Sequence, residues 1–133
     1  MWPVNTGDRW ITAAAALELA TGAGLIAAPS LVARLLFGAE LTAPGQATGR
    51  FAGFVLLSLA AACWPRGATT SASLPALQAL LLLSVLAAGY LLYLGIDGQL
   101  VGIVLWPIAA IHLAFVIGLA RTSITNRPPQ PES

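Results

Sequence analysis

Charged residues are scarce in this sequence. Its 133 residues include no lysine, and six arginines with five acidic residues make up only 8% of the chain. An average soluble domain has about 25% charged residues, because a chain folded in water needs a polar surface. Apolar residue types account for 58% of the sequence, and the mean hydropathy is +0.85. This composition excludes an ordinary soluble domain and indicates a membrane protein with a single domain.

Cysteine and histidine are also scarce, and each scarcity removes a class of chemistry. Cys63 is the single cysteine, so an internal disulfide, a CxxC redox pair and a cysteine-based metal site are excluded. His112 is the single histidine, which excludes a HExxH zinc site. The sequence has no GxSxG, P-loop or Rossmann glycine pattern, and no basic stripe for nucleic acid. We therefore expect no metal, no cofactor and no nucleic-acid partner, with Cys63 a small apolar residue in a span.

Long apolar runs are abundant, and four of them are long enough to cross a bilayer, which takes about 20 residues. The first run begins late and contains Glu18, so we interpret it as a retained span and not as a cleaved signal peptide. The segment SLVARLLF, between Pro29 and Gly38, is too short to span and predicts an interfacial helix. The sequence thus predicts an all-α polytopic membrane protein, a four-transmembrane-helix bundle of residues 1–120 with a disordered polar tail, 121–133. The predicted spans are 10–28, 49–64, 74–94 and 100–120, and the predicted interfacial helix is 30–37.

Two details of these boundaries depend on proline. Residues 40–48 are rich in proline, glycine and threonine and predict a loop before the second span. Pro107 would lie inside the fourth span, where a missing N–H removes a backbone hydrogen bond. The sequence therefore predicts a kink at Pro107.

The arginines are distributed unevenly between the two ends of such a bundle. Four spans place both termini on one side of the membrane, and cytoplasmic segments are the richer in arginine and lysine. The pattern predicts cytoplasmic N- and C-termini, and the lysine-free, alanine- and leucine-rich composition favours a bacterial plasma membrane (the inner membrane). The arginines on the side of the termini are Arg9, Arg66, Arg121 and Arg127, against Arg34 and Arg50 on the other side.

Small residues recur at four-residue spacing in three of the spans. Such stripes let two helix backbones approach closely, because packing drives helix association in lipid. We therefore expect helix contacts along them. The stripes are Ala16, Ala20, Gly24 and Ala28 in the first span, Gly49 and Gly53 in the second, and Ala110, Ala114 and Gly118 in the fourth. A second small face of the first span contains Ala14, Glu18 and Gly22.

Four polar residues fall at one depth when each span is counted from its predicted cytoplasmic end. Glu18, Ser58, Ser84 and His112 each lie about 10–14 Å into a different span, at about 1.5 Å per residue. An acid at mid-helix costs roughly 3 kcal/mol on insertion scales, so Glu18 needs water, a proton or a partner. His112 is the candidate partner, since a hydrogen bond between the two would let one proton serve both groups. These four residues form the candidate polar intramembrane site.

Each candidate also has a purely structural interpretation. Glu18 would be a neutral carboxyl bonded to a neighbouring helix. His112 lies on a bulky face of its span, which favours contact with another subunit or a cavity over contact with Glu18. Ser58 and Ser84 would bond to their own backbone one turn earlier. Arg50 would be a headgroup or ligand contact, because an arginine near a helix end reaches toward the headgroups.

The first half of the chain resembles a known family. A small-residue span is followed by AAPSLVARLLFG, a loop, and GRFAGFVLLSLAAACW. This order is similar to the small DoxX-like four-helix membrane proteins of bacteria, in which a Pro-started interfacial stretch ends near Leu-Phe-Gly and Arg-x-x-Gly opens the second span. The resemblance implies the four-span fold; most members are uncharacterised, and the name-giving ones are associated with quinone-linked redox systems. The matching positions are Pro29, Leu36, Phe37, Gly38, Arg50 and Gly53.

Three functions agree with these residues. The first is a non-enzymatic accessory or assembly component, whose small-residue faces contact a membrane partner protein. The second is a proton-coupled small transporter that uses Glu18 as a homodimer. Four spans and a first-span glutamate resemble the small multidrug resistance transporters, although the interfacial helix and long loop fit that family poorly. The third is a membrane enzyme on an apolar substrate, with Glu18 and His112 as its acid–base pair. The missing catalytic motifs favour the first.

Overall fold

The computed structural model describes residues 6–65 and 74–125, and within these ranges all regular structure is helical. Four of the helices in these ranges are long and apolar enough to cross a membrane, so the fold is the all-α, four-span bundle that the sequence predicts. Residues 66–73, which lie between the predicted second and third spans, are outside the described residues. The helices are α1 (Thr6–Ala27), α2 (Pro29–Phe37), α3 (Ala43–Cys63), α4 (Leu74–Asp97) and α5 (Leu105–Thr125).

Proline and glycine set the boundaries of the short helix α2. Pro29 is at the first turn of α2, where its missing N–H is not needed, and Ala28 before it leaves the helical region at φ −146°. Gly38 ends the helix at φ 71°, a left-handed conformation that favours glycine, and its N–H donates to the Arg34 carbonyl at 2.9 Å. The interfacial helix predicted at 30–37 therefore forms as a separate helix of nine residues.

Helix α3 begins six residues before the predicted start of its span. The loop predicted at 40–48 is wrong from Ala43 onward, because residues 43–48 belong to the helix. Thr42 caps this helix by accepting a hydrogen bond from the Gly45 N–H through its side chain, and Pro44 lies in the first turn. Both features are typical helix-start chemistry, which the abundance of proline and glycine concealed.

Helix α5 begins later than the predicted span of 100–120. Its first residue is Leu105, so Pro107 lies in the first turn, where no backbone hydrogen bond is lost. The kink predicted at Pro107 therefore has no cause at this position. The connection between α4 and α5 is therefore longer than the stretch 95–99 that separates the two predicted spans. Gly98 begins this connection in a left-handed conformation at φ 74°.

The C-terminal end of α5 extends beyond the predicted span. Residues 121–125 are helical, so a disordered tail starting at residue 121 is wrong for this part, and residues 126–133 lie outside the described residues. The hydroxyls of Thr122 and Thr125 donate to the carbonyls of Gly118 and Arg121 at 2.9 and 3.0 Å. These bonds let polar side chains remain in the last turns of the helix.

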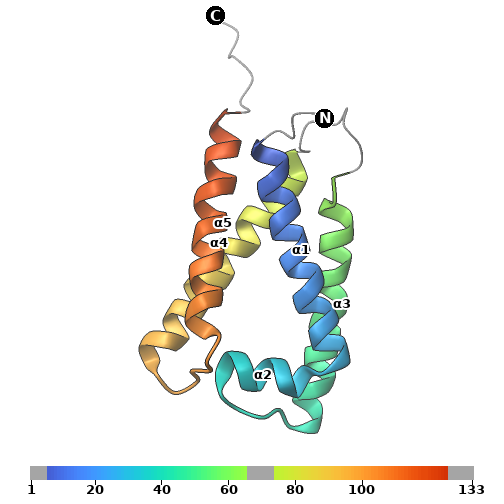
Figure 1. Cartoon of the computed structure of the whole chain (residues 1–133). Coiled ribbons are helices and arrows are strands. Elements are labelled where there is room, and N and C mark those ends of the chain that lie inside the picture. The colour runs from blue at the N-terminus through green and yellow to red at the C-terminus, as the bar shows by residue number, and fades with distance from the viewer. Residues whose placement is uncertain (1–5, 66–73, 126–133) are drawn as a thin grey trace, which may run out of the picture.

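The bundle is built from two helical hairpins. Helix α1 packs mainly against α3, and α4 packs mainly against α5 (Figure 1). In Figure 1 the start of α1 and the end of α5 lie at the same end of the bundle, while α2 lies across the opposite end. We call these the terminal end and the α2 end. The two hairpins contact each other through α1, which packs against both α5 and α4.

Two glycines bring the backbones of α1 and α3 into contact. A Cβ atom at Gly22 would lie 2.8 Å from the Gly53 carbonyl oxygen, and one at Gly53 would lie 2.7 Å from that of Gly22. The close approach expected at Gly53 is therefore confirmed, and its partner lies on the α1 face that contains Glu18. The other α1 stripe is not used in the same way, because Ala16 and Ala20 are exposed.

Helix α2 ties the two hairpins together at the α2 end. The N–H groups of Gly102 and Val104, which precede α5, donate to the carbonyls of Leu36 and Leu35 at 3.0 and 3.1 Å. These two carbonyls belong to the last turn of α2, where no intrahelical donor remains. The contact joins the loop of one hairpin to the helix that follows α1.

The hydrophobic core consists of two separate clusters, one toward each end of the bundle. They share no residue, and the stretch of α5 between Ala109 and Phe115 connects them. The cluster at the terminal end contains Ile11, Ala14, Cys63, Ala76, Leu77, Leu80, Phe115 and Leu119. The cluster at the α2 end contains Leu91, Leu94, Leu105 and Ala109. Cys63 is thus a buried apolar residue, as predicted.

Candidate functional site

Glu18 and His112 meet in the interior, between the two hydrophobic clusters. Glu18 lies one turn after Ala14 on α1, and His112 lies between Ala109 and Phe115 on α5. Their residues are only 5% and 8% exposed, and Glu18 Oε1 lies 3.7 Å from His112 Nε2. The hypothesis that His112 faces another subunit is therefore wrong. The inward face of α5 consists of residues at helical spacing, Leu105, Ala109, His112 and Phe115. The bulky side chains on this face fill the core.

The other nitrogen of the imidazole fixes its tautomer. His112 Nδ1 lies 2.9 Å from the carbonyl oxygen of Ile108, which can only accept, so Nδ1 carries a proton and donates. Nε2 is therefore the nitrogen that faces the Glu18 carboxyl group. A pair with one proton between Oε1 and Nε2 has no net charge in either of two states: a protonated carboxyl that faces a neutral imidazole, or a carboxylate that faces an imidazolium.

The surroundings of the pair are apolar and aromatic. The His112 ring packs edge-on against Phe115, with centroids 6.4 Å apart, and Phe115 packs edge-on against Trp10 at 6.3 Å. The sequence analysis did not predict this aromatic chain, because a tryptophan at the start of a span is also typical of a membrane interface. The sequence pattern that could have indicated this aromatic chain is the spacing of His112 and Phe115, which lie on one face of a helix at i and i+3.

The two serines of the predicted layer have different positions. Ser84 on α4 is 2% exposed, so it belongs to the interior at this level. Ser58 on α3 is exposed, and its hydroxyl donates to its own backbone at the Phe54 carbonyl, 2.8 Å away. The structure therefore does not bring Ser58 to the Glu18–His112 pair. The bond to Phe54 is the alternative expected of serine in an apolar helix.

Arg50 lies on the outer surface of α3, away from this pair. It is exposed and occupies the third turn of the helix, because α3 begins earlier than predicted. A contact with lipid headgroups stays a prediction. Arg34 on α2, which is predicted to lie on the same side of the membrane as Arg50, forms an exposed ion pair with Glu40. The α2 end therefore contains an acid–base pair of its own, in a very different environment.

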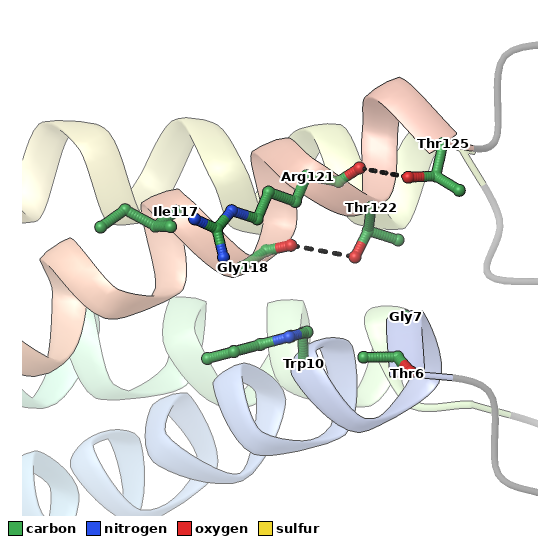
Figure 2. Close-up of a pocket in the computed structure, with 8 residues that line it drawn as sticks. All are labelled: Thr6, Gly7, Trp10, Ile117, Gly118, Arg121, Thr122 and Thr125. Carbon is green, nitrogen blue, oxygen red and sulfur yellow. Dashed lines mark hydrogen bonds between the residues drawn. The ribbon is translucent and has the colours of Figure 1, made fainter.

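A cavity of about 390 Å³ lies between α1 and α5 at the terminal end (Figure 2). We call it the terminal cavity. Trp10 is part of its lining and also packs against Phe115, and neither Glu18 nor His112 lines the cavity. No sequence pattern indicated this cavity, because its walls come from opposite ends of the chain. The lining residues are Thr6, Gly7, Trp10, Ile117, Gly118, Arg121, Thr122 and Thr125.

A second, larger cavity is almost entirely apolar and lies at the α2 end. Its volume is about 460 Å³, and residues of α1, α2 and α3 line it. It contains no charged side chain, and Thr21 and Thr48 are the polar residues of its lining. In a membrane such a surface is suited to acyl chains, so it does not by itself indicate a specific ligand.

The described residues offer little for metal chemistry. Within 6–65 and 74–125, no three His, Cys, Asp or Glu side chains lie close enough together to hold a metal ion. A carboxyl group facing an imidazole nitrogen is suited to proton exchange. In comparisons with protein-family models, with curated proteins and with solved structures, nothing matches this chain.

Proposed function

We propose that this chain is a small proton-coupled membrane protein in which Glu18 and His112 are the proton site. The observation that supports the proposal is the 3.7 Å contact between their side chains within an apolar interior. An ionisable residue at membrane depth is expensive, and such residues commonly mark proton or ion pathways. Of the three functions that agree with the sequence, proton-coupled transport makes the most direct use of this pair.

The number of protons on the pair determines the free-energy cost of burying it in the membrane. With one proton the pair is neutral overall, whereas loss or gain of a proton leaves a net charge in an apolar interior. A net charge there must be offset by water, by a counter-ion or by movement of the surrounding helices. A cation that replaces the proton near Glu18 would restore neutrality, which is the physical basis of exchange between protons and a cationic substrate.

The pair is also placed where its charge affects the arrangement of the helices. Glu18 belongs to the α1–α3 hairpin and His112 to the α4–α5 hairpin. A change in their attraction acts directly on the contact between the hairpins. Two packed arrangements that differ in this contact would give the alternating access that a transporter needs.

The test is flux in liposomes that contain the purified full chain. With an imposed proton gradient and tetraphenylphosphonium as the probe cation, the protein should drive cation movement, and Glu18→Gln should abolish it. The matched control is Glu40→Gln, which neutralises an exposed acid on the same chain and should leave flux unchanged. Equal flux in Glu18→Gln and the unaltered protein would contradict the proposal.

A role as an accessory or assembly component is the second candidate, and one observation favours it. The small residues Ala16 and Ala20 on α1, and Ala110 and Ala114 on α5, are exposed and do not pack within this chain. In lipid such faces are suited to close contact with another helix, either from a partner protein or from a second copy.

Photo-crosslinking in native membranes tests this second role. A photoreactive residue at Ala20 should give a defined protein adduct, whereas the same residue at Leu82, exposed on α4, should give lipid adducts only. Lipid adducts at both positions would leave the small-residue faces as lipid-facing surface and remove the argument for an assembly role.

The arginine distribution supports a proposed orientation, and the lysine-free composition supports a proposed location. We propose a bacterial plasma membrane, cytoplasmic termini and a DoxX-like family relationship, which the Pro29 and Gly38 boundaries of α2 support. Arg9 and Arg121 lie at the terminal end, in agreement with a cytoplasmic assignment. An impermeant maleimide should label Thr125→Cys only after the cells are permeabilised. Labelling in intact cells would reverse the orientation.

A further inference from the structure

The terminal cavity has the features of a binding site, independently of the proton site proposed above. It lies between the first turns of α1 and the last turns of α5, at the terminal end of the bundle (Figures 1 and 2). Its lining combines the apolar groups of Trp10 and Ile117 with the hydroxyl groups of three threonines and the guanidinium of Arg121. Ile117 is exposed on the outer surface of α5.

Two glycine contacts fix the walls of this cavity. A Cβ atom at Gly118 would clash with the Trp10 indole, and one at Gly7 would lie 2.6 Å from Cγ2 of Thr122. The indole thus packs directly on the α5 backbone, and the threonine methyl packs on the α1 backbone. Because each helix contributes one glycine and one side chain, the spacing of α1 and α5 is set at two points. The cavity lies beside these contacts and is part of the packed structure.

The direction of the Arg121 side chain is the feature that indicates a bound ligand. Figure 2 shows the guanidinium folded back along α5, over Gly118 and toward Ile117, with Trp10 on the facing helix. This direction leads away from the helix end and toward the middle of α5, whereas an arginine near the end of a span usually extends toward water. Neither ion pair among the described residues involves Arg121. A cation at this depth gains most from an anion beside it.

The hydrogen-bonding groups of the cavity point to an acceptor-rich ligand. The Thr122 and Thr125 hydroxyls already donate to their own backbone carbonyls, so Arg121, with five N–H donors, is the main donor of the lining. A neighbouring cavity of about 400 Å³ shares Thr6 and Trp10 with the terminal cavity and adds Arg9. Both lining arginines are cationic, and Asp8 lines neither cavity.

We propose that the terminal cavity binds the phosphate headgroup of an anionic membrane lipid, with Arg121 as the counter-ion. A guanidinium binds phosphate oxygens through two parallel N–H bonds, which suits an arginine that approaches from one wall. The acyl chains of the lipid lie along Ile117 and the outer face of α5, and the Trp10 indole packs against the glycerol region. A soluble organophosphate has the same phosphate chemistry and lacks the chains, so the experiment separates these two sources.

Binding is measured by isothermal titration of the full chain in a non-ionic detergent. The probe is dihexanoyl phosphatidic acid, and the reference is dihexanoyl phosphatidylcholine, whose headgroup is zwitterionic. The unaltered protein should bind the anionic lipid, and Arg121→Gln should weaken binding about tenfold, the loss expected for a charge-assisted bidentate contact. The matched control is Arg50→Gln, since Arg50 is also an exposed arginine on a span but lines neither arginine-containing cavity.

A second variant tests the cavity without removing charge. Thr125→Trp places an indole at an exposed position of the lining and should weaken binding while Arg121 remains. Thermal unfolding without lipid shows whether each variant is folded. Three results would overturn the proposal: equal binding of the two lipids, equal loss in Arg50→Gln and Arg121→Gln, or unchanged binding in Thr125→Trp. Competition by millimolar inorganic phosphate would overturn the lipid assignment in favour of a soluble phosphate.

Discussion

This chain contains two acid–base pairs, one buried and one exposed. The side chains of His112 and Glu18 are 10% and 6% exposed, whereas those of Arg34 and Glu40 are 63% and 68% exposed. The exposed pair is screened by its surroundings, and such pairs contribute about 0–1 kcal/mol. The buried pair has no such screening, so removal of one partner leaves a polar group that nothing else offsets. Similar residue chemistry therefore has different consequences at the two places.

The largest effect is expected when the buried pair loses one partner. Glu18→Ala leaves His112 in an apolar interior, and His112→Ala leaves Glu18 there. Each should lower the free energy of unfolding by about 2–4 kcal/mol, because an isolated buried polar group is costly. The double variant should cost less than the sum of the two single changes. Unfolding in mixed micelles, followed by circular dichroism, measures all three, and strictly additive losses would mean that the two side chains do not interact.

An intermediate effect is expected when the helix packing beside the buried pair is disturbed. Gly53→Ala places a Cβ atom 2.7 Å from the Gly22 carbonyl oxygen, and Gly22 lies one turn after Glu18 on the same face of α1. The overpacked contact should cost about 1–3 kcal/mol and shift α1 relative to α3.

The control for this variant is Gly89→Ala on α4. A Cβ atom at Gly89 would meet nothing within 4 Å, so alanine should be neutral or stabilise the helix by up to about 1 kcal/mol. The same unfolding measurement compares the two glycines. Equal effects at Gly53 and Gly89 would show that backbone contact does not determine the position of α1.

The smallest effect is expected at the exposed pair. Glu40→Gln removes the ion pair with Arg34 but leaves both side chains in a polar, exposed position. The free energy of unfolding should change by no more than about 0.5 kcal/mol, since exposed substitutions rarely do more. Unfolding at low and high salt checks this point. A loss as large as that of Glu18→Ala would remove the distinction between the two environments.

The sequence predicted the class of fold well because the signal for it is local. Apolar runs of sufficient length, Pro29 and Gly38 determine the spans and the break before α2, and each acts within its own segment. The ends of α3 and α5 were harder to predict, because Pro44 and Pro107 allow both a loop and a first helical turn. The choice between them depends on capping, which composition does not reveal.

The site was predicted only in part, since it depends on how the helices rotate. Depth along each span indicated Glu18 and His112 as a pair, and the structure brings them together. Depth also indicated Ser58, which instead lies on the outer surface, because counting residues along a helix does not determine which face turns inward. The terminal cavity had no sequence signal, because Trp10 and Gly118 are brought together only by packing of the two hairpins.

The central claim is that Glu18 and His112 hold one proton between them inside the bundle. The chain has a single histidine, so ¹⁵N-histidine labelling gives the imidazole signals of His112 alone in solid-state NMR of the protein in lipid. Nδ1 should be protonated, in agreement with its bond to Ile108, and the Nε2 signal should shift in Glu18→Gln but not in Glu40→Gln. An unprotonated Nδ1, or an Nε2 signal unaffected by Glu18→Gln, would contradict the account.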